Sequence, residues 1–250
     1  MHHFFVEPQC VGEEEIIITG SDINHIKNVL RMTVDEELLI SDGQGRDYCC
    51  IISNLLDDKI VARITGENAE RTELSSKFYL FQGLPKSDKM ELIVQKAVEL
   101  GVYEIIPFKA KRCVVKLDDK KADSKIKRWQ SISESAAKQS KRGIIPNVHD
   151  VMTFKEAVEY AKTFDISIIP YENFKDMTST REVIEKIGGN MNIGIFIGPE
   201  GGFDSEEVDY AFENGIHPIS LGKRILRTET AGFVAASLIQ YELSDLGGVI

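Results

Sequence analysis

Residues 193–236 read IGIFIGPEGGFDSEEVDYAFENGIHPISLGKRILRTETAGFVAA, and the class of fold that we predict rests on them. The apolar run 193–197 is short enough for a buried parallel strand, and it stops at the glycine-rich turn 198–202. A helix should begin after Asp204, because Glu207 lies at capping-box spacing from it. The order strand, glycine turn, helix is typical of one half of an αβ unit.

The same order then repeats further along the chain. Gly215 suits the end of the first helix, and residues 216–221 read as a second strand. A second glycine turn follows at 222–224, and residues 228–243 carry apolar side chains at helical spacing. The two repeats predict an α/β fold.

Glycine turns after parallel strands suit a ligand site, because no Cβ keeps a small molecule from the backbone. Neither turn matches a nucleotide signature: 198–202 lacks the G-x-G-x-x-G pattern, and Gly222-Lys223-Arg224 is not a P-loop. The alternative is that the glycines serve only tight strand-to-helix turns.

Strand and helix patterns also alternate upstream of this stretch. We predict strands at 78–82, 102–108 and 166–170, and helices at 88–101, 123–140 and 153–162. Such alternation predicts a mainly parallel sheet with helices on both faces. Trp129 lies three residues from both Ile126 and Ile132, which favours a core position over a stacking platform for bases.

The N-terminal region has a different pattern. Short strand-like segments separated by turns predict a small β-barrel, interrupted by one helix at 21–31; the strands are 4–6, 15–19, 37–41, 48–53 and 59–65. Residues 67–76 are polar and mark a boundary, so we predict domains at 1–72 and 73–250.

Charge is distributed unevenly over the 250 residues, whose formal net charge is −10. Residues 107–146 hold twelve Lys or Arg against four acidic residues, while the remainder holds 18 basic and 36 acidic ones. A basic segment on an acidic body can attract RNA phosphates. The competing interpretation is a solvated helix face.

Cysteine and histidine positions indicate the compartment and the cofactor class. The four cysteines form no C-x-x-C pair, and the five histidines are scattered, so we expect neither disulfides nor a metal site. No apolar run approaches the ~18 residues of a membrane span, and the N-terminus is no signal peptide. We therefore expect a cytoplasmic protein.

Several blocks together resemble one family, the ribosomal RNA small subunit methyltransferase E family of the SPOUT superfamily. The blocks are MHHFFVE (1–7), HIKNVLRM (25–32), KSDKMELIVQKAVELGVYEIIPF (86–108), RWQSISESAAKQSKRGIIP (128–146), GPEGGF (198–203) and LGKRILRTETA (221–231). The chain departs from the family at His3, where a basic residue usually precedes the paired phenylalanines.

The resemblance implies an enzyme that transfers a methyl group from S-adenosylmethionine to N3 of one uridine in 16S ribosomal RNA. It implies a PUA-like RNA-binding barrel followed by a SPOUT-type trefoil knot, in a homodimer. Methyl transfer of this kind needs no metal. The positions that match the family's cofactor loops are Pro170, Tyr171, Glu172, Ile197, Gly198, Pro199, Glu200, Gly201, Leu221, Gly222, Ile225 and Leu226.

Two polar residues beside the second loop are our catalytic candidates. Uridine N3 carries a proton, so methylation requires an acceptor for that proton and a cation near the developing imide charge. We assign the acceptor to Glu229 and the cation to Arg227. Glu229 could instead serve only as a first-turn helix charge.

Five further residues are candidates for RNA contact: His3, Arg31, Arg46, Arg112 and Arg142. Arg31 could equally end its helix as a cation that suits the helix dipole. Two other functions stay open, namely an RNA-binding ribosome assembly factor with little catalysis and a SPOUT enzyme that methylates another position, such as a ribose 2'-hydroxyl. A dinucleotide-dependent oxidoreductase is disfavoured because G-x-G-x-x-G is missing.

Overall fold

In the computed structural model, the 193–236 stretch folds as strand, helix, strand and helix, as predicted. These elements are β11 (Asn192–Ile197), α6 (Ser205–Glu213), β12 (Ile216–Ile219) and α7 (Thr228–Glu242). The predicted capping box between Asp204 and Glu207 is present, and Gly215 has a φ of 83° just beyond the helix end. The structure describes residues 1–68, 72–115, 119–172, 174 and 177–243.

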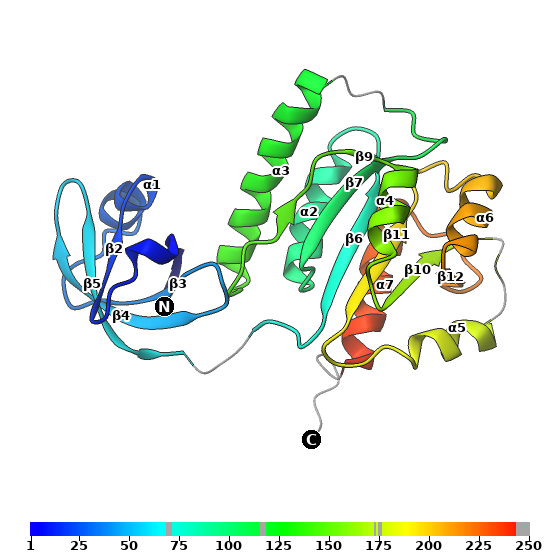
Figure 1. Ribbon diagram of the computed structural model, residues 1–250. Helices are drawn as coiled ribbons and strands as arrows, with labels where there is room; N and C mark the ends of the chain where they lie inside the picture. Colours follow the sequence, from blue (N-terminus) through cyan, green and yellow to red (C-terminus); the bar gives the residue numbers. More distant parts are fainter. Residues whose placement is uncertain (69–71, 116–118, 173, 175–176, 244–250) are drawn as a thin grey trace. The chain divides into compact units, whose positions relative to one another are not determined.

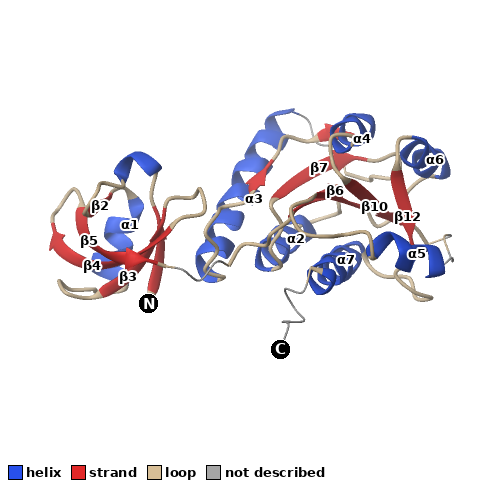
Figure 2. Ribbon diagram, turned by 60° about the horizontal axis from the view of Figure 1, so that its bottom comes forward, coloured by secondary structure: helices blue, strands red, loops and turns tan. Residues whose placement is uncertain are grey.

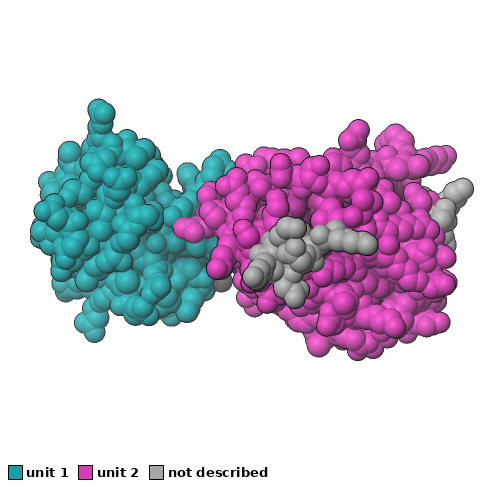
Figure 3. All heavy atoms as spheres, turned by 90° about the horizontal axis from the view of Figure 1, so that it is seen from above, with its two compact units in different colours: residues 1–73, 137–145 teal, residues 74–136, 146–250 magenta. Residues whose placement is uncertain are grey.

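The chain divides into two compact units, coloured teal and magenta in Figure 3. Unit 1 consists of residues 1–73 and 137–145, and unit 2 consists of residues 74–136 and 146–250. Each unit has its own sheet, so each is described by itself.

Unit 2 contains the predicted parallel sheet (Figure 1). Within the described residues its strand order is β12-β10-β11-β6-β7-β8, with β9 also paired to β7. The remaining strands are β6 (Lys77–Gly83), β7 (Glu104–Lys109), β8 (Asn147–Val148), β9 (Met152–Thr153) and β10 (Ile166–Pro170). All these pairings are parallel, which agrees with the continuous apolar runs in the central strands.

Helices cover both faces of this sheet, as Figure 2 shows. On one face lie α4 (Phe154–Ala161) and α6, and on the other lie α2 (Lys89–Glu99), α5 (Met177–Ile184) and α7. A further long helix, α3 (Asp119–Gln139), begins in unit 2, and its last residues belong to unit 1. The rings of Phe81 and Phe196 stack 4.2 Å apart in the core beneath α4 and α6. Trp129 of α3 is 4% exposed, which confirms its predicted burial.

Unit 1 is a five-stranded curled sheet of order β1-β3-β4-β5-β2 within the described residues. Its strands are β1 (His2–Phe5), β2 (Glu15–Ile18), β3 (Glu37–Ser41), β4 (Asp47–Leu55) and β5 (Ile60–Glu67). The pairing of β4 with β5 is interrupted by two register shifts, at 49–50 and 52–54 of β4. One face packs on fully buried side chains such as Ile16, Ile40 and Ile52.

The helix predicted at 21–31 in unit 1 is not one regular α-helix. One α-helical turn, α1 (Ser21–Asn24), continues into a π-helical turn, η2 (His25–Val29). A short 3₁₀ turn, η1 (Pro8–Cys10), precedes β2. Single π turns occur often at functional sites, so this segment remains of interest for RNA contact.

The described residues contain no helix long and apolar enough to cross a membrane. The same part of the chain holds no group of three or more His, Cys, Asp or Glu side chains arranged to bind a metal ion.

Candidate active site

A pocket of about 610 Å³ lies at the carboxyl edge of the unit 2 sheet. Three chain segments form most of its walls: 170–172 at the end of β10, 197–203 at the end of β11, and residues 220–222 and 224–228, which lead from β12 into α7. Lys89 and Ala231 complete the lining. Because parallel strands end at the same edge, the segments that follow them meet there. All twelve predicted cofactor positions line this one pocket. Its volume is typical of small-molecule sites, which hold about 300–1,000 Å³.

The turn after β11 depends on glycine for close packing. A Cβ on Gly201 would lie 3.0 Å from Cβ of Arg112, and one on the neighbouring strand end, at Gly83, would lie 2.7 Å from Cδ of Pro199. Gly202 has a φ of 67°, and its amide donates to the carbonyl oxygen of Pro199 over 2.9 Å. Gly83 and Gly201 therefore allow this turn to pack closely against its neighbours, and Gly202 supplies its left-handed backbone conformation.

The turn after β12 presents apolar side chains to the pocket. Leu221, Ile225 and Leu226 line it, and Ile225 is 85% exposed. Gly222 adopts a φ of 103°, which residues with a Cβ rarely adopt. The third wall is joined to this one, because the amide of Tyr171 donates to the carbonyl oxygen of Ile219 over 3.1 Å. An exposed apolar slot suits a flat heterocycle such as adenine.

Two buried polar residues connect the pocket walls at their base. The Thr228 hydroxyl donates to the carbonyl oxygen of Gly198 over 2.6 Å, and Nε2 of Gln82 donates to the same hydroxyl over 2.9 Å. The sequence interpretation missed both residues. Gln82 is a polar side chain at the end of an apolar strand, and that signal could have identified it.

Lys89 is the other residue that the sequence interpretation missed. Its Nζ lies 3.1 Å from Oε1 of Glu200 in the first turn and 3.4 Å from Oε2 of Glu229, the second residue of α7. The hydrogen bond to Glu200 raises the pKa of Lys89. Partial burial raises the pKa of Glu200, but hydrogen bonds from its own backbone, Lys89 and Lys86 outweigh this and lower it overall. The ammonium of Lys89 therefore lies between the carboxylates of Glu200 and Glu229, and of these three residues Lys89 and Glu200 line the pocket.

Of the two catalytic candidates, Arg227 lines the pocket directly and is an exposed residue just before α7. The side chain of Glu229 is 16% exposed and turns toward Lys89. The structure thus places Arg227 in the pocket wall, whereas Glu229 does not line the pocket and is connected to it through its ion pair with Lys89, which does.

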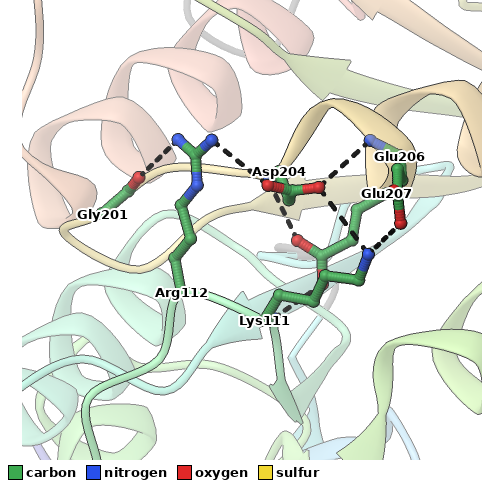
Figure 4. Close-up of polar contacts among 6 residues, drawn as sticks. All are labelled: Lys111, Arg112, Gly201, Asp204, Glu206 and Glu207. Atoms are coloured by element: carbon green, nitrogen blue, oxygen red, sulfur yellow. Dashed lines mark hydrogen bonds and ion pairs between the residues drawn. The ribbon is translucent and has the colours of Figure 1, made fainter.

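Arg112, a predicted RNA contact, lies beside the pocket and holds its first turn (Figure 4). Its guanidinium donates to the carbonyl oxygen of Gly201 and to Oδ2 of Asp204, each over 3.3 Å. The neighbouring Lys111 reaches Asp204 and Glu206 through Nζ, and its amide donates to Glu207 over 2.8 Å. This cluster anchors the start of α6 to the segment after β7.

The other RNA candidates all lie in unit 1. His3 is 8% exposed and its Nε2 lies 2.5 Å from the Ser41 hydroxyl, so the ring offers little surface to RNA. Arg142 is 3% exposed and pairs with Glu73 at 2.5 Å. Arg46 is exposed in the turn between β3 and β4.

Arg31 is exposed, and its φ of 55° lies in the left-handed region. Glycine is the usual residue in that conformation. An arginine held there is a reason to seek a function for its side chain.

Charges of the basic segment 107–146 pair with acidic residues of other elements. Besides Arg112 and Arg142, Arg128 pairs with Glu91 at 3.1 Å, and Lys138 pairs with Asp22 at 3.2 Å. The segment is also divided between the two units. These pairings favour a solvated, ion-paired helix surface over a dedicated RNA face.

Comparison with known proteins agrees with this geometry. The sequence model of one protein family, the RNA methyltransferase domain, matches residues 72–240. A second family model, the RNA methyltransferase PUA domain, matches residues 18–65. Ribosomal RNA small subunit methyltransferase E of Bacillus subtilis (strain 168) is 37% identical, covering 99% of each chain. The same-named protein of Mesomycoplasma hyopneumoniae (strain 232) is 36% identical over 92% of this chain and 95% of its own.

A solved structure extends the comparison to the fold. The crystal structure of the Neisseria gonorrhoeae protein of that name, bound to S-adenosyl methionine, superimposes with a TM-score of 0.84. It is 30% identical and covers 97% of this chain and 98% of its own. The chain belongs to the ribosomal RNA small subunit methyltransferase E family.

Proposed function

We propose that this protein methylates N3 of a specific uridine in 16S ribosomal RNA and takes the methyl group from S-adenosylmethionine. The main support for this proposal is that all twelve predicted cofactor-binding residues line one pocket. Membership of the family, and the S-adenosyl methionine bound in the Neisseria gonorrhoeae structure, support the cofactor assignment.

The residues of the pocket fit this cofactor. Leu221, Ile225 and Leu226 would enclose the adenine, and the glycine turn at 198–202 would allow the rest of the molecule to contact backbone groups. When bound, S-adenosylmethionine supplies a methyl group activated by a positively charged sulfur.

Glu229 supplies the proton acceptor that uridine N3 requires, and Arg227 supplies the cation that stabilises the developing imide charge. As the N3–H proton moves to the Glu229 carboxylate, the N3 electron pair forms the new N–CH₃ bond. The C–S bond breaks, and its electron pair stays on sulfur as S-adenosylhomocysteine leaves. Arg227 stabilises the negative charge that develops on the imide oxygens. Most of the acceleration comes from holding N3, the methyl carbon and sulfur in line.

Each of the two predicted domains has its own function, RNA binding in the first and catalysis in the second. Residues 1–72 form the RNA-binding domain, and we assign its substrate contacts to Arg31 and Arg46, which are exposed and thus accessible to RNA. Residues 73–250 form the catalytic domain, and here the chain is threaded as a trefoil knot. The bond from Thr228 to Gly198 supports the knot, because it shows the segment after β12 passing directly beside the turn after β11. The active form is a cytoplasmic homodimer.

The test is methylation of small ribosomal subunits from cells that lack the enzyme. Purified protein and labelled S-adenosylmethionine are incubated with the subunits, and the digested RNA is analysed by mass spectrometry. We expect N3-methyluridine at one position. A 2'-O-methylated nucleoside would instead favour another SPOUT reaction, and RNA binding without any methyl transfer would favour an assembly factor.

A further inference from the structure

Lys89 lines the pocket and connects Glu200 of the pocket wall to Glu229, which lies behind the wall and far from Glu200 in the sequence. It begins α2, Glu200 lies in the turn after β11, and Glu229 lies in the first turn of α7. In the part of the chain that the structure describes, neither carboxylate pairs with another Lys, Arg or His within 4.0 Å. The ammonium of Lys89 is therefore the shared ion-pair partner of both Glu200 and Glu229.

The burial of the two carboxylates makes this cation necessary. The side chain of Glu200 is 25% exposed and that of Glu229 is 16% exposed. Two carboxylates held together with so little water around them repel each other, and a shared cation relieves the repulsion. Removing it would leave a largely buried charge without compensation.

The two carboxylates do not depend on Lys89 equally. Glu200 also accepts hydrogen bonds from the backbone amide of Lys86, at 3.1 and 3.2 Å to its two oxygens. Oε2 of Glu229 is shielded from solvent and has no hydrogen-bond partner among the described residues, so the ammonium of Lys89, 3.4 Å away, is the group that offsets its charge there. Loss of the ammonium should therefore release Glu229 while the turn that holds Glu200 stays anchored.

We propose that Lys89 is a positioning residue for the methyl transfer, which holds Glu229 in the orientation that accepts the N3 proton. The inference rests on the proposed function, because it assigns Lys89 a role through the proton acceptor. Lys89 acts on the acceptor rather than on cofactor binding. Its removal should consequently lower kcat and change cofactor affinity little.

The primary test is Lys89→Met, which removes the charge and keeps most of the side-chain volume. We expect kcat at saturating RNA to fall about 10- to 100-fold, which is less than the roughly 10²- to 10⁴-fold contribution of a proton-transfer group itself, because Lys89 acts only through Glu229. The Kd for S-adenosylmethionine, measured by calorimetry, should stay within about threefold, since Glu200 keeps its bonds from Lys86. Lys89→Arg keeps a cation and should recover most of the lost rate. Lys96→Met is the matched control, because Lys96 lies on the same helix but pairs with Glu99.

A double-mutant cycle separates this role from general stability. In a Glu229→Gln background, Lys89→Met should reduce kcat less than threefold further, because the group that it positions is already gone. The idea is overturned if Lys89→Met leaves kcat unchanged, or if its full effect persists in the Glu229→Gln background. Failure of the proposed function looks different, since the unmodified protein would then transfer no methyl group to the RNA.

Discussion

Arg227 is the residue on which the chemistry most directly depends in our scheme. It lines the pocket immediately before α7, and its carbonyl oxygen accepts the amide of Ala231 over 2.8 Å, so its backbone is held by the start of the helix. The backbone is fixed while the side chain is exposed. This combination suits a group that meets a substrate arriving from solvent.

We expect Arg227→Ala to lower kcat at saturating RNA about 10- to 1,000-fold, because in our scheme Arg227 stabilises the charge that develops on the imide oxygens. Affinity for S-adenosylmethionine should change little. Single-turnover methylation assays would measure the rate. Lys223→Ala is a suitable control, since Lys223 is an exposed cation of the same turn but does not line the pocket. Normal turnover of Arg227→Ala would exclude a chemical role.

His3 makes the stability of unit 1 depend on pH. Burial lowers its pKa from 6.5 to about 4, so between these values the unfolded chain binds a proton that the folded chain does not. Stability is fully present above pH 6.5 and falls as the pH drops toward 4. We expect a loss of about 2 kcal/mol from this group, after allowance for partial solvent screening.

Asp47, which accepts a hydrogen bond from Ser41, acts in the opposite direction. Burial raises its pKa, so the folded state takes up a proton before the unfolded state does, and this offsets part of the loss. Urea unfolding between pH 4 and 8 would measure the net effect. His3→Gln should make the free energy of unfolding depend less on pH. His2→Gln should not change this dependence, because His2 is exposed. A His3→Gln profile as steep as that of the unmodified protein would contradict the assignment.

Among the elements, α6 connects helix capping to the ligand site. The Asp204 side chain caps the helix and also accepts from Arg112, which bonds Gly201 in the pocket wall. The caps of α4 and α6 are both capping boxes and neither cap residue lines the pocket, but the Thr153 hydroxyl bonds Glu156 of its own helix whereas Asp204 is linked through Arg112 to Gly201 of the pocket wall. The two caps should thus stabilise their helices similarly and differ in their effect on the ligand.

Replacing each cap by alanine tests this difference. Asp204→Ala and Thr153→Ala should each reduce the free energy of unfolding by about 1 kcal/mol, the usual value of an N-cap. Only Asp204→Ala should also weaken S-adenosylmethionine binding, by about threefold to tenfold, because it loosens the turn at 198–202. Urea unfolding and calorimetry provide the two readouts. Equal cofactor affinity in the two variants would show that the cap does not act on the pocket.

Elements with strong local signals could be predicted from sequence, and others could not. The capping box of α6 and the apolar run of β11 are local patterns, and both were located correctly. The two-residue strands β8 and β9 exist only because β7 offers a pairing edge, so no local pattern marks them. The same reason applies to Lys89, because its contacts with Glu200 and Glu229 depend on how three distant segments fold.

At the scale of the whole molecule, the net charge of −10 opposes binding of RNA, so local cations have to provide the attraction. Many cations of the basic segment are paired with acidic side chains in the structure. Exposed arginines of unit 1 thereby become the stronger candidates for phosphate contact, with Arg46 and Arg31 foremost.

We expect Arg46→Ala to weaken RNA affinity about threefold to tenfold and to reduce the slope of log K against log salt by about one. The rate at saturating RNA should be unchanged, because the substitution removes binding alone. Filter binding at several salt concentrations would measure both quantities. Arg181→Ala is the control, since Arg181 is exposed but its charge is already paired with Glu185 at 2.7 Å. If Arg46→Ala leaves the slope of log K against log salt unchanged, Arg46 does not contact an RNA phosphate.

The bonds among Gln82, Thr228 and Gly198 have a consequence for the lifetime of the protein. They join segments nearly 150 positions apart along the chain, so the pocket is complete only when most of unit 2 has folded. A cofactor that binds only this complete state protects the unit from proteases that attack unfolded chains. At 100 times its Kd the protection amounts to about 2.7 kcal/mol. Cells depleted of S-adenosylmethionine should therefore degrade this enzyme faster, which links its abundance to the supply of methyl groups.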